Sequence, residues 1–383
     1  MSFSEAHKKI LKALKDEDLR KGSFEATKEE VVNRREAIER HPYVIKWAGE
    51  IRELKRDILI QQESLLEKFK NSFLGENKYF YFVDSKEDMK AIVLKIINDK
   101  KTIVKSKSLV GEEVELRQFL EKHEISIYET DLGEFLVQLV NGKPAHMVTP
   151  AVNMTEKRAR TVLQPFINEK LDDITSIVLG VRKFMREKFL SAEIGIIGAN
   201  ALAADTGSII FITNEGNGAL SSILPEKLIV ITSIEKIYER FLDAFKASIV
   251  QTNYSGFKNT SYIHILNGAS EVDLPGPKEI YLVLLNNGRI RDDFLKETLA
   301  CVKCGSCQLS CPIFHIIDGS WGHIYTAAIG IPWTAITGSI KIANDLSYFC
   351  LGCGRCKEVC PMDINIPDII RKLKKLRLIL IMH

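Results

Sequence analysis

The eight cysteines of this 383-residue chain all fall in two short runs, CVKCGSCQLSCP from Cys301 and CLGCGRCKEVCP from Cys350. Both runs read C-x2-C-x2-C-x3-C-P, which is the spacing of bacterial ferredoxins that bind [4Fe-4S] clusters. Three closely spaced thiolates on a tight loop can reach three corners of one iron–sulfur cube. Gly305 and Gly354 let the backbone curl toward the inorganic sulfides, so that amide N–H groups point at them. The fourth cysteine of each run, which precedes Pro, points away from its own loop.

The fourth cysteine sets the pairing between the runs, because in two-cluster proteins it ligates the other cluster. The crossing ties the two halves together, so we expect the clusters to be needed for folding. Zinc is the rival interpretation, but zinc has no use for the repeated third C-x2-C step, and a [3Fe-4S] centre at one site is a lesser alternative. The first predicted [4Fe-4S] cluster is ligated by Cys301, Cys304, Cys307 and Cys360. The second is ligated by Cys350, Cys353, Cys356 and Cys311.

The 38 residues between Cys311 and Cys350 are too many for the tight loop of a minimal ferredoxin. Residues 323–346 show helical periodicity with a Gly-Pro break, so the sequence predicts an α-helical two-cluster ferredoxin domain over residues 291–383. Two clusters in one small domain suit electron transfer, and not chemistry on a substrate. Three side chains near the clusters are expected to pack or to donate hydrogen bonds, and not to ligate iron: His315, Trp321 and His323.

The composition is that of an ordinary soluble globular protein, with 45% hydrophobic and 27% charged residues. A net charge of +3 is too small to indicate nucleic-acid binding. The N-terminus lacks the apolar core of a secretory signal, and the stretch nearest to a membrane span, Ile329–Ile340, is too short to cross one. We therefore expect a cytoplasmic protein without a transmembrane segment, in which clustered cysteines favour metal over disulfides. Peripheral membrane contact through partners stays open.

The elements that must position the cysteine region are predicted from the spacing of apolar residues. In residues 1–75 apolar residues recur every three or four positions, which predicts a helical lead-in packed on the next domain; a partner-docking arm is the alternative. Over residues 76–290 short strands alternate with helices, which is typical of an α/β fold with a mostly parallel sheet. Strands are expected at 78–84, 101–108, 125–131, 145–152, 192–205, 207–217, 227–234 and 279–287. Helices are expected at 29–40, 50–69, 85–99, 174–190 and 234–248.

Small and polar residues gather in the segment GANALAADTGSIIFITNEGNG, Gly198–Gly218. Its Gly and Asn residues suit turns with positive φ, and its polar residues flank an apolar strand. In parallel sheets ligands bind beyond the carboxyl ends of strands, so the segment fits a ligand site and a structural turn equally well. No G-x-G-x-x-G or Walker sequence occurs, so neither a dinucleotide fingerprint nor an NTPase is indicated.

Over residues 20–370 the sequence resembles the lactate utilization protein B family, the iron–sulfur subunit of a bacterial and archaeal L-lactate utilization system. The resemblance is carried by both cysteine runs together with TIVKSKSLVGEEVELRQFLEKHEISIYETDLGEFLVQL, PAHMVTPAVNMT, DTGSIIFITNEGN and GPKEIYLVLLNNGR. It implies a LUD domain at residues 76–290, with a fold similar to CoA transferases and sugar-phosphate isomerases. It also implies a complex with two further subunits that together oxidise L-lactate to pyruvate.

The resemblance further implies a pocket for a carboxylate or other small anionic ligand in the LUD domain. The family motifs fall on the loop that starts at Lys105, on the ETDLGE segment after Glu112, and on the turn at residues 205–217. The alternative is that Lys105 and Glu215 pair with each other or cap secondary-structure elements. The residues that match the E…ETDLGE motif are Glu112, Glu129, Asp131 and Gly133. The residues predicted to bind the ligand are Lys105, Ser106, Ser108, Asp205, Thr206, Gly207, Asn214, Glu215 and Asn217.

These features predict an electron-transfer subunit of a complex that oxidises L-lactate, or a related 2-hydroxy acid, to pyruvate. Lactate oxidation removes two electrons, whereas each cube carries one, so two clusters in series would pass electrons singly. Nothing in the chain reads as a flavin site, so we expect the two-electron cofactor on a partner. The alternatives are a redox or ligand sensor, a scaffold protein and a subunit of a heterodisulfide-reductase-like complex. No catalytic residue is predicted.

Overall fold

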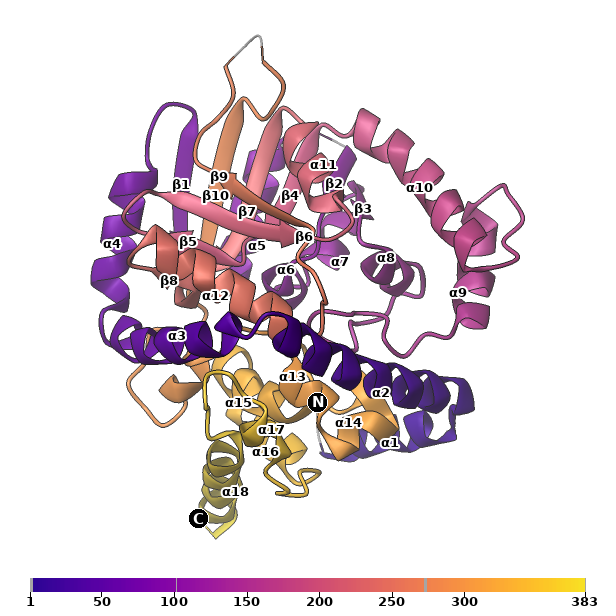
Figure 1. Ribbon diagram of the computed structural model, residues 1–383, viewed down its shortest axis with the longest axis vertical. Helices are drawn as coiled ribbons and strands as arrows, with labels where there is room; N and C mark the ends of the chain where they lie inside the picture. Colours follow the sequence, from indigo (N-terminus) through magenta and orange to yellow (C-terminus); the bar gives the residue numbers. More distant parts are fainter. Residues whose placement is uncertain (1–2, 101, 272–273, 383) are drawn as a thin grey trace.

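The computed structural model describes residues 3–100, 102–271 and 274–382, which form a layer of strands and helices above a helical C-terminal region (Figure 1). The central sheet has six strands, all parallel, in the order β1-β10-β7-β4-β2-β3. Its inner strands are rich in Ile, Val and Leu because both faces are covered. The mostly parallel α/β sheet is therefore confirmed. The strands are β1 (Lys78–Val83), β2 (Thr102–Lys105), β3 (Ser126–Glu129), β4 (Ile194–Gly198), β7 (Lys227–Ser233) and β10 (Glu279–Leu285).

Helices cover both faces of this sheet. Ser85 begins the first of them by accepting a hydrogen bond from the Asp88 amide at 3.0 Å, which confirms the predicted Ser cap. On one face lie α5 (Lys86–Ile97), α6 (Leu109–Glu113) and α7 (Leu116–Glu121), which share a hydrophobic cluster with the strands. Beside β2 and β3 lie α8 (Leu132–Leu139), α9 (Glu156–Leu163), the 3-10 turn η1 (Gln164–Phe166) and α10 (Ile174–Ser191), and α11 (Asn217–Ile223) lies on β4.

A smaller sheet lies beside the central one, in the order β8-β5-β6-β9, and α12 (Phe241–Tyr254) packs on it. Two of its pairings are antiparallel, β5 with β6 and β6 with β9. Together the two sheets form the strand layer of the molecule, named here the sheet layer. The strands of the smaller sheet are β5 (Ala201–Ala203), β6 (Ser208–Thr213), β8 (Ile237–Tyr238) and β9 (Tyr262–Leu266).

Three of the elements predicted for residues 145–248 are wrong, and tertiary context explains each of them. The strand expected at 192–205 divides into β4 and β5, which belong to different sheets; the Asn200 side chain holds the bend by accepting from the Ile212 amide at 2.9 Å. The helix expected at 234–248 begins only after the 3-10 turn η2 (Ile234–Lys236) and β8. The strand expected at 145–152 is an irregular loop, because it lies against the C-terminal helices with no neighbouring strand to pair with.

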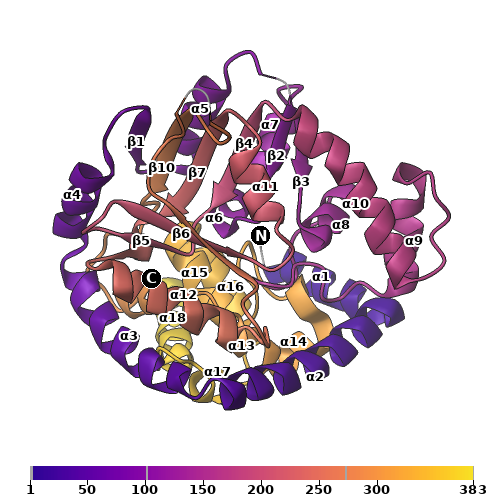
Figure 2. The same cartoon turned by 45° about the horizontal axis from the view of Figure 1, so that its top comes forward.

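Four helices make up the predicted lead-in: α1 (Phe3–Lys15), α2 (Glu17–Arg40), α3 (Tyr43–Ile60) and α4 (Gln62–Phe73). The single helix expected at 50–69 is interrupted at Gln61, which has non-helical backbone angles between α3 and α4. Figure 2 shows α2 and α3 as an arc along one edge of the molecule. Because α3 lies on α12 while α1 and α2 lie on C-terminal helices, the lead-in packs on both parts of the chain.

The C-terminal region is helical, as the sequence predicts, but its main interruption lies elsewhere than expected. Helix α15 continues through Gly330 and Pro332, and the chain bends at Gly338 instead. Every residue of α15 is buried, so packing on all sides holds its backbone helical around a proline that would otherwise break it. The elements are η3 (Lys296–Ala300), α13 (Ser306–Leu309), α14 (Pro312–Ile317), η4 (Asp318–Ser320), α15 (Ala327–Thr337), α16 (Ile340–Ser347), α17 (Arg355–Glu358) and α18 (Ile366–Met382).

One hydrophobic cluster joins the N-terminal helices, the two sheets and the C-terminal region. It contains Phe69 of α4, Leu282 of β10 and Trp333 of α15 among its buried members. The cysteine region therefore shares its core with the sheet layer. In the part of the chain that the structure describes, no helix is long and apolar enough to cross a membrane.

Candidate iron–sulfur centres

The two cysteine loops fold alike. In each loop a glycine with left-handed backbone, Gly305 (φ 80°) or Gly354 (φ 83°), begins a one-turn helix, α13 or α17. In each, the amide two residues after the first cysteine donates to the sulfur of that cysteine, at 3.3 Å in the first loop and 3.4 Å in the second. Side chains disfavour this φ, so glycine allows the loop to turn its amides inward. The duplication in sequence is thus a duplication in structure.

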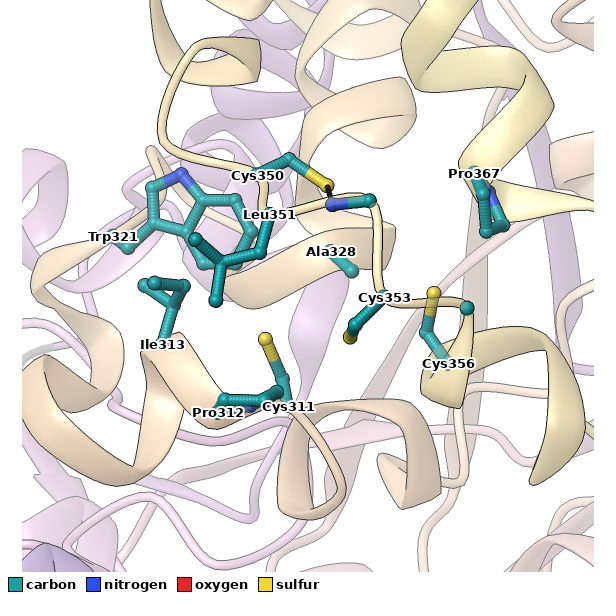
Figure 3. Close-up of a pocket in the computed structure, with 12 residues that line it drawn as sticks. Cys311, Pro312, Ile313, Trp321, Ala328, Cys350, Leu351, Cys353, Cys356 and Pro367 are labelled. Carbon is teal, nitrogen blue, oxygen red and sulfur yellow. Dashed lines mark hydrogen bonds between the residues drawn. The ribbon is translucent and has the colours of Figure 1, made fainter.

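Four cysteines line each of two cavities beside these loops. In each cavity three cysteines come from one run and the fourth comes from the other, so the sulfurs are grouped in the two crossed sets described above. The first cavity, with about 330 Å³ of empty space including some open to solvent, is lined by Cys301, Cys304, Cys307 and Cys360. The second cavity, with about 340 Å³ measured in the same way, is lined by Cys311, Cys350, Cys353 and Cys356 (Figure 3).

The electrostatics of the thiols follow the same crossed grouping. Burial raises the pKa of Cys360 to about 12, and the neighbouring thiols that raise it further are Cys301 and Cys304. Burial likewise raises the pKa of Cys311 to about 11, with Cys350 and Cys353 adding to the effect. Because iron binds thiolate, a cluster must displace protons that these buried thiols hold tightly. Cluster binding is therefore coupled to the release of these protons.

The donor arrangement fits an iron–sulfur cube better than a single ion. Among the described residues, no three His, Cys, Asp or Glu side chains lie close enough together to hold one metal ion. Tetrahedral zinc would require four ligands at about 2.0–2.3 Å, whereas a cube places its irons at separate corners of a larger body. The walls between the sulfurs are mostly apolar, including Met147 and Ile329 in the first cavity and Leu351 in the second. Sulfur donors around an apolar cavity are what a [4Fe-4S] cluster needs.

The two cavities differ in the exposure of one ligand. Each has two buried cysteines, Cys304 and Cys307 in the first and Cys311 and Cys356 in the second. The helix α13 of the first loop packs against α2, and its Ser306 donates to the Tyr254 carbonyl at the end of α12. In the second cavity Cys353 is exposed, and the lining residue Leu351 keeps 66% of its surface accessible. The second cavity is therefore the one with a solvent-exposed cysteine.

A buried network of charged side chains, which the sequence analysis did not predict, joins the first loop to the sheet layer. Lys303, between two cysteines of the first run, pairs with Glu235, and Arg289 Nε lies 2.8 Å from the same carboxylate. Arg289 also pairs with Glu113 at 2.6 Å, and Glu113 accepts a hydrogen bond from the Tyr325 hydroxyl at 2.6 Å. Although burial opposes ionisation, Arg289 and Lys303 hold the pKa of Glu235 well below its usual range. Each of these groups depends on its partners, because an unpaired buried charge is costly.

The loop at 145–152 holds the first cysteine loop in place. His146 is fully buried, and its Nδ1 accepts from the Thr149 amide at 3.1 Å, so the ring proton lies on Nε2 and is donated to the Gly305 carbonyl at 3.2 Å. Burial lowers the pKa of His146 to about 4, which keeps the ring neutral. Beside it, the Gln308 side chain accepts from the Met147 amide at 3.2 Å. An irregular buried loop has no periodic signal, so sequence analysis did not predict this role.

Two histidines and a tryptophan were expected to pack near the clusters without ligating iron. Trp321 lines the second cavity, and its indole N–H donates to the Leu346 carbonyl at 3.0 Å. His315 forms a hydrogen bond with the Leu309 carbonyl, and burial lowers the pKa of His323 to about 4. Neither histidine lines either cavity in the described part of the chain.

Lys105, the first residue of the predicted ligand pocket, is neutralised by carboxylates. Its ammonium lies 2.8 and 2.9 Å from the two oxygens of Glu129 and 3.7 Å from Glu112. Pairing with Glu215, one part of the alternative interpretation, is therefore wrong. Ser106 donates its backbone amide to Ile196, and the Ser108 side chain caps α6. These contacts give the loop a structural role at the end of β2.

The remaining predicted ligand residues divide between the two ends of β6. Before the strand, Gly207 packs against the Ser72 backbone of α4, where an added Cβ would lie 2.3 Å from the Ser72 carbonyl oxygen. After the strand, Asn214 accepts from the Ser261 amide at 3.1 Å, while Glu215 lies near Asp131. A strand of six residues separates its ends by about 17 Å, so the two groups do not converge on one site. The first group is Asp205, Thr206 and Gly207, and the second is Asn214, Glu215 and Asn217.

Fold and cavities together define a two-cluster iron–sulfur protein built on an α/β layer. In a comparison with protein families, residues 66–285 match the LUD domain and residues 297–364 match the 4Fe-4S dicluster domain. The chain holds two [4Fe-4S] clusters.

Among known proteins, the chain is 32% identical to "Lactate utilization protein B" of Bacillus subtilis (strain 168), over 93% of this chain and 77% of that protein. It is 31% identical to "Uncharacterized electron transport protein YkgF" of Escherichia coli (strain K12), over 96% of this chain and 79% of that protein. A crystal structure of a duf162 family protein from Deinococcus radiodurans aligns over 59% of this chain and 98% of that one, with 15% identity and a TM-score of 0.32. The chain belongs to the lactate utilization protein B family.

Proposed function

We propose that this protein is the iron–sulfur electron-transfer subunit of a complex that oxidises L-lactate, or a related 2-hydroxy acid, to pyruvate. The observation that carries the proposal is the pair of four-cysteine cavities, of which the second has a solvent-exposed cysteine. Each cluster carries one electron at a time. The two electrons of a 2-hydroxy acid would therefore pass through the chain singly.

The substrate class is supported by the named relative from Bacillus subtilis, and the electron-transfer role also by the one from Escherichia coli. The sets of four cysteines are proposed as the ligands of the two clusters, within a ferredoxin domain at 291–383 that follows a LUD domain at 76–290. The clusters supply one-electron storage, and the residues around them control access of water and hold the first cysteine loop in position. Apolar walls limit water at the first cavity, and His146 keeps the first loop in position.

Exchange of electrons with partner subunits is proposed at the second cavity. Its ligand Cys353 is exposed, so a partner can bring a redox centre close to the cluster without disturbing the fold. The two-electron cofactor that oxidises the 2-hydroxy acid is assigned to such a partner.

The test is to isolate the native assembly under anaerobic conditions, identify its subunits, and measure L-lactate-dependent reduction of an artificial acceptor. A variant with both Cys304→Ala and Cys353→Ala, one change in each cavity, serves as the control without complete clusters, and its co-purification with the partner subunits is measured first. The proposal expects acceptor reduction with the wild-type chain and little with the variant. Equal reduction by both assemblies, or an assembly that binds L-lactate without turnover, would contradict it.

A further inference from the structure

Lys303 occupies a backbone position that the other cysteine loop gives to glycine. Lys303 has φ 60° and its counterpart in the second run, Gly352, has φ 70°. A lysine in this conformation carries backbone strain that glycine would avoid. We therefore expect the lysine side chain to make interactions that offset this strain. The ammonium pairs with buried Glu235 and lies 4.6 Å from the centre of the Trp333 ring. The first loop therefore places a cation beside its own cluster cavity.

Further cations lie near the first cysteine loop. Lys55 of α3 is fully buried and donates to the Glu235 carbonyl. Arg34 of α2 donates to the Ser310 side chain, at the end of the same cysteine loop, at 3.1 Å. Arg52 donates to the carbonyl of Pro361, which lines the cavity, at 3.1 and 3.2 Å. Other cations on this side include Lys55, Lys303, Arg34 and Arg289. The carboxylates that pair with Arg289 and Lys303 are Glu113 and Glu235.

The indole N–H of Trp333 provides a second polar feature at this cavity. The group is buried and has no hydrogen-bond partner among the described residues. It lies beside the Cys301 thiol. A buried donor without a partner is costly, and a cluster-bound thiolate would accept its hydrogen bond.

The second cavity lacks a counterpart to this arrangement in the described structure. The N–H of its tryptophan, Trp321, is already bound to the Leu346 carbonyl. The nearby cation Lys374 donates to the Cys350 carbonyl at 3.2 Å, and Arg355 and Lys357 are exposed. Charges in contact with solvent are screened far more than buried ones.

We propose that Trp333 and the buried cations around Lys303 raise the reduction potential of the first cluster above that of the second. Reduction adds one negative charge to a cluster, and nearby cations and N–H donors stabilise that charge. Burial alone acts in the opposite direction, because it disfavours the more charged state. The cations outweigh it here because they act at short range in a region of low dielectric.

This order of reduction potentials sets the direction of electron transfer between the two clusters. An electron that reduces the second cluster from outside passes to the first cluster, which is reduced as the second is reoxidised. The first cluster, beside the sheet layer, is then the electron sink of the pair. This inference rests on the proposed function for the presence of both clusters, but the potentials can be measured without lactate.

The test is a potentiometric titration of the anaerobic protein with dithionite, followed by electron paramagnetic resonance. Cys353→Ala removes an exposed ligand of the second cavity, so the signal that persists in it belongs to the first cluster. Trp333→Phe keeps an aromatic ring but loses the N–H, and Lys303→Met loses the cation. Both are expected to lower the first-cluster midpoint and to leave the second unchanged. Trp321→Phe is the matched control, because its N–H serves a backbone carbonyl, and it should leave the first midpoint unmoved.

The iron and sulfide content of each variant shows whether its clusters are intact. If one of Trp333→Phe and Lys303→Met fails to fold, the test uses the other. A first-cluster midpoint at or below that of the second would overturn the proposal. So would a first-cluster midpoint that neither Trp333→Phe nor Lys303→Met moves. By contrast, intact clusters that L-lactate and the partner subunits cannot reduce would overturn the proposed function, while the measured midpoints would still decide this inference.

Discussion

Adding a methyl group to the glycine of each cysteine loop separates backbone strain from loss of the contact with His146. A Cβ at Gly305 would lie 2.3 Å from His146 Nε2, whereas a Cβ at Gly354 meets nothing within 4 Å beyond its chain neighbours. Both glycines are left-handed, so alanine costs about 1–2 kcal/mol at either position. At Gly305 the buried ring must also move and lose hydrogen bonds, which costs about 1–3 kcal/mol more. The totals are about 2–5 kcal/mol for Gly305→Ala and about 1–2 kcal/mol for Gly354→Ala.

The assay compares iron content and thermal unfolding of the two variants after anaerobic purification. Gly354→Ala should keep both clusters with a small loss of stability, and Gly305→Ala should lose iron from the first cavity. In a His146→Ala background the Gly305→Ala change should cost less, because the ring that it would displace is gone. Equal losses in the two single variants, or the same cost for Gly305→Ala with and without His146, would refute the clamping role of the 145–152 loop.

Three further predictions concern single residues. Cys360→Ala should abolish the signal of the first cluster, although it lies in the second run, and loss of the second signal alone would contradict the crossed ligand sets. Glu113→Gln should lower the free energy of unfolding, measured by urea titration, by about 3–5 kcal/mol, because it leaves Arg289 buried with one carboxylate fewer. As a control, Glu67→Gln breaks an exposed ion pair and should lower the same free energy by under about 1 kcal/mol. The pKa of His146 is about 4 when folded and near 6.5 when unfolded, so the unfolded state binds more protons between these values, and stability should fall as pH drops from 6.5 toward 4. His146→Gln should flatten that part of the pH profile, and an unchanged slope would contradict the assignment.

Elements with strong local signals could be predicted from the sequence. The apolar runs of β7 and β10 and the capped helix α5 agree with expectation, because burial on both faces and a Ser cap are encoded in a few adjacent residues. Elements whose structure depends on contacts with residues far away in the sequence could not be predicted. The 145–152 loop has a strand-like pattern, but its polar groups bind the cysteine region, and Pro332 lies inside a helix that packing holds together.

The candidate site divides in the same way. The spacing of the cysteines determines which of them can share a cluster, so the grouping of sulfurs around two cavities could be predicted from the sequence. The buried network did not, because its members are far apart: Lys303 and Glu235 are separated by 68 positions, and Arg289 and Glu113 by 176. Each of them, taken alone, is an ordinary charged residue. Only the fold brings them together.

The most direct test is whether electrons from lactate reach the clusters of this chain. The anaerobic assembly is mixed with L-lactate, frozen at successive times, and examined by electron paramagnetic resonance alongside the amount of pyruvate formed. We expect reduced cluster signals to appear at the rate of pyruvate formation, with up to about two electrons stored per chain. Pyruvate formed at full rate while dithionite-reducible clusters stay oxidised would contradict an electron-transfer role.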